Sequence, residues 1–155
     1  MPPYNPRRHV WGSHIRRERG RAQGPLMAIV RNHTRGTVLA STTEQAVSTR
    51  ARLVGLIGRD GLAEGAALIL PGTPWVHTFF LSFALDLVFY GGGGHVLVVV
   101  EALPPWRLSP ICWRARGVIE LPAGAVRLSG TRPGDLLRIS TAPSVAAFDE
   151  SDSCR

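Results

Sequence analysis

Residues 85–102, LDLVFYGGGGHVLVVVEA, contain two β-type apolar runs separated by four consecutive glycines. Val, Phe, Tyr and Leu are typical of strands, whereas glycine marks turns. No Lys-Ser or Lys-Thr pair follows the glycines and no helical pattern begins there, which argues against a phosphate-binding loop. The stretch therefore predicts a hairpin of two strands, residues 85–90 and 95–102.

Further short apolar runs lie on both sides of this hairpin, and turn-forming residues such as Pro71-Gly72 and Thr131-Arg132-Pro133-Gly134-Asp135 separate them. The predicted additional strands are residues 26–30, 37–39, 67–70, 76–80, 115–121 and 136–140. One main helix is predicted over residues 48–58, since Ser48 can cap its first turn, and a short helical turn over residues 124–128. Many short strands favour a mainly β fold, a sandwich or a small barrel.

Composition and charge divide the 155 residues into three parts. Residues 26–141 carry the apolar runs and form one domain. Residues 142–155 are expected to form a short acidic tail. Residues 1–25 are expected to form a basic tail; alternatively, translation starts at Met27 and these residues are not part of the protein. The basic tail contains Arg7, Arg8, Arg16, Arg17, Arg19 and Arg21, which could make weak, sequence-independent contacts with nucleic acid or another polyanion.

The sequence shows no sign of export or of a membrane span. Two cysteines are too few for a disulfide-stapled scaffold, so Cys112 is expected to be a lone thiol. No run of 18 apolar residues occurs, and no apolar segment follows the arginine pairs of the first 25 residues. These features predict a cytoplasmic protein.

Motifs for metal or cofactor chemistry are missing from the sequence. The five histidines are scattered and the two thiols are far apart, which argues against a metal site. A Gly-x-Ser-x-Gly elbow, a Walker loop and a dinucleotide fingerprint are also absent. We therefore expect no metal and no cofactor.

Two polar residues within predicted strands allow both a structural and a catalytic interpretation. His77 could bond a backbone carbonyl or Asp86, and Asp86 could form an ion pair with Arg52 or Arg59, because buried polar groups need partners. Alternatively, His77 and Asp86 could serve a hydrolase or isomerase. Glu120 is expected to cap the turn at Ala123-Gly124 or to join an ion pair, rather than to act as an acid or base.

A third group of residues combines aromatic rings with arginines. Such residues can line a ligand groove or cover the end of a β core. The candidate ligand-binding residues are Trp75, His77, Arg59, Trp106, Arg107 and Trp113.

Several motifs occur together in an order that resembles the domain of unknown function 192 family, a group of small bacterial and archaeal proteins. They are Arg52-x-x-Gly55-Leu56-Ile57-Gly58-Arg59, Val76-His77-Thr78-Phe79-Phe80, Leu85-Asp86-Leu87-Val88-Phe89, Pro104-Pro105-Trp106-Arg107 and Ile119-Glu120-Leu121-Pro122-Ala123-Gly124. The resemblance covers nearly the whole predicted domain. It implies a β-sandwich or barrel-like fold with one main helix, and no established activity.

The chain departs from the pattern of similar proteins at several positions. They often place Met at Leu81, Pro at Ala84, an acidic residue at Val47 and Cys near Thr73 or Pro74, where the thiol could partner Cys112. The residues and the resemblance together predict a non-enzymatic β domain that binds a small ligand or a protein partner. The alternatives are a polyanion binder acting through the arginine tail and an enzyme using His77 and Asp86.

Overall fold

The computed structural model describes residues 28–45 and 56–141, which form eight strands, a 3-10 turn and one short α-helix. The strands are β1 (Ala28–Asn32), β2 (Thr37–Ala40), β3 (Thr42–Gln45), β4 (Ala66–Pro71), β5 (Leu85–Tyr90), β6 (Val96–Leu103), β7 (Gly117–Pro122) and β8 (Leu137–Thr141). The 3-10 turn η1 (Gly92–Gly94) lies in the β5–β6 hairpin, and the helix α2 (Ala125–Ser129) follows β7.

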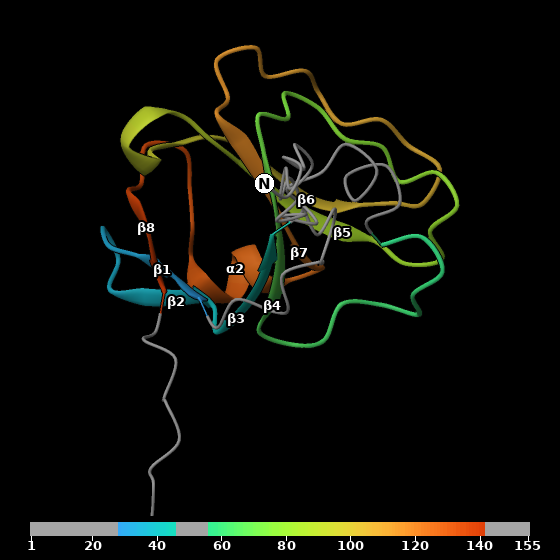
Figure 1. Cartoon of the computed structure of the whole chain (residues 1–155), viewed down its shortest axis with the longest axis horizontal. Helices are drawn as coiled ribbons and strands as arrows, with labels where there is room; N and C mark the ends of the chain where they lie inside the picture. Colours follow the sequence, from blue (N-terminus) through green and yellow to red (C-terminus); the bar gives the residue numbers. More distant parts are fainter. Residues whose placement is uncertain (1–27, 46–55, 142–155) are drawn as a thin grey trace, which may run out of the picture.

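The strands form two sheets, so the predicted mainly β fold is confirmed (Figure 1). The smaller sheet has the order β2-β1-β8, and the larger has the order β3-β4-β7-β5-β6. All pairs are antiparallel except β3 with β4. The larger sheet does not close into a barrel, and α2 contacts strands of both sheets.

The larger sheet is buried on both faces. One face packs against the smaller sheet through a core that includes Val30, Val88 and Ile119. The other face, called the outer face here, carries Leu68, Leu87 and Val118 beneath Leu56, Val76 and Leu81 of the long connections. Double burial explains why β5 reads as a nearly continuous apolar run rather than an alternating one.

Most of the predicted strands match these elements, one predicted strand is wrong, and one observed strand was not predicted. The strand predicted over residues 85–90 coincides with β5. The strand predicted over residues 76–80 is wrong, because this segment forms only an isolated bridge between His77 and Leu108. The polar edge strand β3 was not predicted. The main helix predicted over residues 48–58 lies mostly outside the described residues, and residues 56–58 form a turn.

A buried aspartate joins β6 to the start of α2. The β5–β6 register shifts at Asp86, and this bulge leaves the Ala102 amide free to donate to Asp86 Oδ1 at 2.8 Å. The amides of Gly124 and Val126 both donate to Asp86 Oδ2 at 2.9 Å. Asp86 thus caps α2 from another strand, which corrects the prediction that Glu120 would cap this turn.

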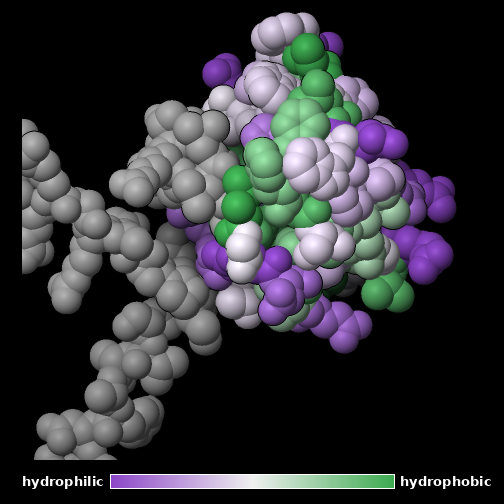
Figure 2. Space-filling model, turned by 90° about the vertical axis from the view of Figure 1, so that its right-hand side faces the viewer, coloured by the Kyte–Doolittle hydropathy of each residue, from purple (hydrophilic) through white to green (hydrophobic). Residues whose placement is uncertain are grey.

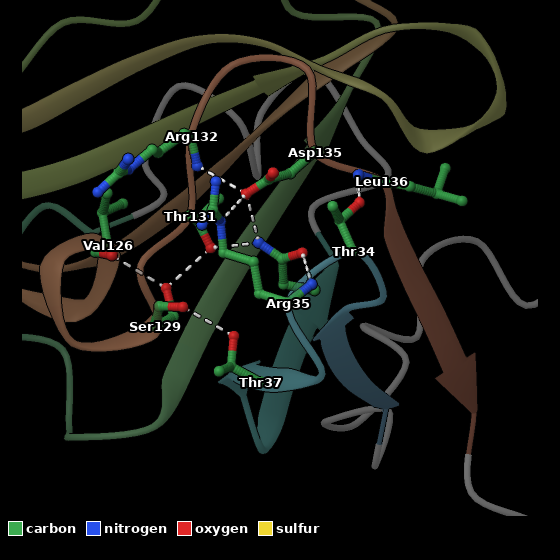
Figure 3. A network of polar contacts seen from close by, with 10 residues as sticks. Thr34, Arg35, Thr37, Val126, Ser129, Thr131, Arg132, Asp135 and Leu136 are labelled. Carbon is green, nitrogen blue, oxygen red and sulfur yellow. Dashed lines mark hydrogen bonds and ion pairs between the residues drawn. The ribbon is translucent and has the colours of Figure 1, made fainter.

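A second buried polar group joins the β1–β2 turn to residues 129–135 (Figure 3). Asn32 Nδ2 donates to Asp135 Oδ2 at 2.8 Å and to Thr131 Oγ1 at 3.1 Å. The same Asp135 oxygen accepts the Arg35 Nε–H at 2.6 Å and the Arg132 amide at 2.9 Å. Asn32, Thr131 and Asp135 are buried, so this network fixes the predicted turn at residues 131–135 against the smaller sheet.

Two remaining sequence expectations concern Cys112 and the membrane. Cys112 is a free thiol, and its amide donates to the Pro74 carbonyl at 2.8 Å. Pro74, near which the resemblance implies a Cys in similar proteins, therefore lies beside Cys112. Within the part of the chain that the structure describes, no helix is long and apolar enough to cross a membrane.

Candidate functional site

Two connections, residues 72–84 between β4 and β5 and residues 104–116 between β6 and β7, carry five aromatic side chains in contact with one another. We call this continuous series of ring contacts the aromatic ladder. Its members, in order of contact, are Trp75, His77, Phe79, Trp106 and Phe80. The His77 and Phe79 rings stack at 5.2 Å, and the Phe80 and Trp106 rings meet edge to face at 4.9 Å. These are favourable aromatic geometries. Three ladder members, Trp75, His77 and Trp106, were ligand-binding candidates in the sequence.

Backbone pairing between the two connections holds the ladder in place. The Thr78 hydroxyl donates to the Pro104 carbonyl at 2.6 Å and accepts the Arg107 amide at 2.9 Å. The Thr78 amide in turn donates to the Arg107 carbonyl at 2.9 Å. This pairing explains why the segment beginning at Val76 does not join either sheet: its polar groups are satisfied by residues 104–109 instead.

Phe80 and Trp106 adopt left-handed backbone conformations, with φ of 66° and 59°. A bulky side chain in this region costs about 1–2 kcal/mol. Burial does not offset that cost, because Phe80 is 66% exposed and Trp106 is 54% exposed. Strain of this kind persists where the surrounding structure enforces it, and it clusters at binding and catalytic sites.

The ladder belongs to a larger apolar surface. Figure 2 shows apolar and aromatic side chains gathered in a band on this face, with hydrophilic side chains along its margin. The exposed large side chains of the two connections are Trp75, Phe80, Trp106, Leu108, Ile111 and Trp113. Contiguous exposed apolar surface of this kind marks interaction sites. We call these residues, with the ladder, the aromatic surface.

The two connections that carry this surface contain charged residues of one sign only. Residues 72–84 and 104–116 contain three arginines and no carboxylate. Arg107 Nη1 donates to the Trp106 carbonyl at 3.2 Å, which keeps its guanidinium beside the ladder. The aromatic surface is therefore suited to a partner that carries apolar groups and negative charge.

The other predicted ligand residues are placed differently. Trp113 is 78% exposed on the same connection as Trp106, without a ring contact to the ladder. Arg59 pairs with Glu44 through both guanidinium nitrogens, at 2.7 and 3.2 Å. The predicted ion pair of Arg59 with Asp86 is therefore wrong. Arg52, the other predicted partner of Asp86, lies outside the described residues.

The structure does not bring His77 and Asp86 together. Both Asp86 oxygens accept backbone amides, and Asp86 is fully buried. His77 Nδ1 is buried and has no hydrogen-bond partner among the described residues, so this nitrogen does not make the expected bond to a carbonyl or to Asp86. An unpaired buried nitrogen is uncommon in a folded protein and here lies within the aromatic ladder.

Glu120 occupies an apolar position on the outer face of the larger sheet. Its neighbours in the adjacent strands are Leu68 and Leu87, and it is only 6% exposed. No described residue forms an ion pair with it. Burial raises the pKa of the Glu120 carboxyl from its ordinary value of 4.5 to about 7. Its predicted role in an ion pair thus finds no partner in the described part of the chain.

We expect Glu120→Gln to stabilise the protein at alkaline pH. A raised pKa in the folded state means that the folded protein binds more protons than the unfolded chain between about pH 4.5 and 7. The stability of the natural protein therefore falls through this window, whereas the glutamine variant escapes that fall. The expected gain above pH 8 is on the order of 2–3 kcal/mol, measured by urea unfolding at pH 5 and pH 8.5.

A matched control for this experiment is Glu101→Gln, which changes an exposed carboxyl on β6. Its unfolding free energy should follow that of the natural protein at both pH values. If the Glu120 variant shows the same pH dependence as the natural protein, the carboxyl is not held protonated by burial.

The described ranges, 28–45 and 56–141, contain no group of three His, Cys, Asp or Glu residues that could hold a metal ion. The aromatic surface likewise offers rings and guanidinium groups rather than hard oxygen ligands. A ligand could therefore stack on its rings and pair with its arginines.

The fold and the surface define a two-sheet β protein with an exposed, strained aromatic patch. A family model described as "Uncharacterized ACR" matches residues 30–139. The chain therefore belongs to the domain of unknown function 192 family, as the sequence motifs indicated.

Two solved structures share the fold. One, a protein of unknown function from Novosphingobium aromaticivorans, superposes with a TM-score of 0.62 at 21% identity, over 74% of this chain and 83% of that one. The other, named as a proposed transcription regulator of Sinorhizobium meliloti, has a TM-score of 0.61 at 26% identity, over 72% of this chain and 91% of that one. None of the curated proteins compared with this chain matches it.

Proposed function

We propose that this protein is a binding module whose aromatic surface receives an acidic, apolar segment of a partner protein. The observation that carries the proposal is the pair Phe80 and Trp106. Both rings are held outward by a strained backbone, in contact with each other, where they contribute little to the core. Aromatic side chains that are rigid and exposed are typical anchors of protein interfaces.

The arginines of the two connections indicate the charge of the partner. Arg107 and Arg114 directly follow the exposed Trp106 and Trp113 in the chain, and neither connection carries a carboxylate. Complementary charge speeds association and excludes partners of the wrong sign. A segment in which an apolar side chain stands between Asp or Glu residues meets both requirements: its apolar group covers the rings and its carboxylates face the guanidinium groups.

Selection from a displayed library of random peptides tests the proposal. We expect the full-length protein to enrich sequences with one or two aromatic or large aliphatic residues flanked by carboxylates. The Phe80→Gly, Trp106→Gly double variant should lose that enrichment, because both anchors are removed. Arg132→Gln, which changes an exposed arginine of the turn at residues 131–135, is the matched control and should select the same peptides.

Two outcomes of the selection would contradict the proposal. One is enrichment of basic peptides, which would place an acidic surface elsewhere as the binding site. The other is an unchanged enrichment by the double variant, which would show that the aromatic pair is not the anchor.

One alternative has its own support. The Sinorhizobium meliloti protein is named as a proposed transcription regulator, and residues 1–25 of this chain hold six arginines. Contact with nucleic acid through Arg7, Arg8, Arg16, Arg17, Arg19 and Arg21 is the resulting hypothesis, although these residues lie outside the described part. Such binding would weaken steeply with salt. It also would not depend on Phe80 or Trp106.

A further inference from the structure

A cavity of about 390 Å³ opens between the two sheets, away from the aromatic surface. Ile119 of β7 lines it from the larger sheet, and Leu137 and Ile139 of β8 line it from the smaller one. Tyr90, residues 91–94 and Arg116 complete the wall. Figure 1 shows η1 above the beginning of β8, on the side of the view opposite to the green connection that carries residues 72–80.

The floor of this cavity is part of the protein core. Ile119 is fully buried and Leu137 nearly so, and both belong to the core between the sheets. An apolar group that entered the cavity would therefore contact the core directly and leave water. The volume lies near the lower end of the range of about 300–1,000 Å³ that small-molecule sites span.

The cavity has one cation and no carboxylate among its lining residues. The Arg116 amide donates to the Tyr90 carbonyl at 2.7 Å, which fixes the backbone of the arginine at the cavity wall. Its guanidinium makes no hydrogen bond or ion pair with any described residue, in contrast to Arg35 and Arg59. A free guanidinium beside an apolar cavity matches a carboxylate with an apolar tail.

The four glycines beside the cavity are not all required by the fold. A Cβ at Gly94 would meet the Leu137 carbonyl oxygen at 2.4 Å, and a Cβ at Gly91 would meet Leu97 at 3.1 Å. Gly93 needs its left-handed φ of 71°. Gly92 has neither constraint, since no atom lies within 4 Å of the position of its Cβ. Gly92 thus lines the cavity without a side chain, although the space beside it would admit one.

We infer that this cavity binds a small monocarboxylate with an apolar tail, whose carboxylate pairs with Arg116 and whose tail contacts Ile119, Leu137 and Ile139. The site is separate from the aromatic surface and does not depend on the function proposed for it. Tyr90 forms a firm wall, because it lies over Gly117, where a Cβ would meet the phenolic oxygen.

Amide chemical shifts of the full-length protein, titrated with hexanoate at pH 7, test the inference. We expect saturable shifts at residues 91–94, 119 and 137–139. The uncharged match, 1-hexanol, should bind at least tenfold more weakly, because it cannot pair with the guanidinium. Arg116→Gln should weaken hexanoate binding by at least tenfold as well, by loss of a charge-assisted pair.

Two further variants complete the test. Arg114→Gln removes an exposed arginine that does not line the cavity and should leave hexanoate binding unchanged. Gly92→Leu should weaken binding, because it adds a large side chain at a position that lines the cavity. Shifts that do not saturate, shifts confined to residues 75–80 and 104–113, or equal affinity of the Arg116 variant would each overturn the inference.

Discussion

Replacing Asp86 by alanine should destabilise the folded protein by about 3–5 kcal/mol. The carboxylate accepts the amides of Ala102, Gly124 and Val126 within a fully buried site. Without it, three backbone donors lose their acceptor, the Val126 amide in a buried position and the other two in partly buried ones, and each unsatisfied buried group costs about 1–3 kcal/mol. Urea unfolding at neutral pH measures the loss.

The matched control is Asp60→Ala, which removes an exposed aspartate that takes no part in the hydrogen bonds of Asp86. Its unfolding free energy should stay within about 0.5 kcal/mol of that of the natural protein. A loss below about 1 kcal/mol for the Asp86 variant would mean that the bulge and the start of α2 do not need this side chain. That result would favour a catalytic role for Asp86 over a structural one.

The second large effect is expected at Asp135. Burial opposes its ionisation, but hydrogen bonds from Arg35, Asn32 and the Arg132 amide outweigh burial and hold the pKa of its carboxyl below the ordinary value of 3.8. Asp135→Ala should cost about 2–4 kcal/mol at pH 7, since Asn32 and Arg35 lose a shared partner.

The pH dependence separates this account from simple loss of volume. Because the pKa of Asp135 is lower in the folded state than in the unfolded chain, its ionised carboxylate stabilises the folded state at pH values above the ordinary pKa of 3.8. This stabilisation is lost as the pH falls through the pKa of the folded state. The difference between the natural protein and the alanine variant should therefore narrow between pH 7 and pH 2.5. A constant difference would contradict the charged role of Asp135. The Asn32→Ala, Asp135→Ala double variant should lose less unfolding free energy than the sum of the losses in the two single variants, because both residues belong to one network.

Local pattern was sufficient to predict most of the sheet strands. β5 was predicted with its observed ends because a doubly buried strand reads as an uninterrupted apolar run between turn formers. The segment from Val76 to Phe80 is also rich in residues that favour strands, yet its partners are residues 104–109 rather than a strand. The sequence of the segment does not encode that choice. β3 was missed because Thr42-Thr43-Glu44-Gln45 is polar, as an edge strand can be.

Long-range polar pairing was the main feature that the sequence did not reveal. The cap of α2 comes from Asp86, 38 residues before Gly124, whereas Glu120 was the nearer acidic candidate. An aspartate inside an apolar strand signals a required buried partner, but the partners are backbone amides and so have no sequence signature. The Asn32–Asp135 bond spans 103 residues for the same reason.

The candidate binding surface was predicted in part. Trp75, His77 and Trp106 were singled out as aromatic residues near arginines, and the structure joins them in one ladder. Phe79 and Phe80 were missed as site residues because their segment was assigned to a strand. The left-handed conformation of Phe80 and Trp106 has no sequence signal, since glycine or asparagine normally marks it.

The most direct test of the central claim is the unfolding free energy of the Phe80→Gly, Trp106→Gly double variant. If the aromatic pair serves binding, relief of backbone strain offsets the lost ring contacts, and stability should stay within about 1 kcal/mol of the natural protein. Phe89→Ala, a fully buried control on β5, should lose about 3–5 kcal/mol. A loss of more than about 3 kcal/mol in the double variant would assign Phe80 and Trp106 to the core and contradict a binding role for them.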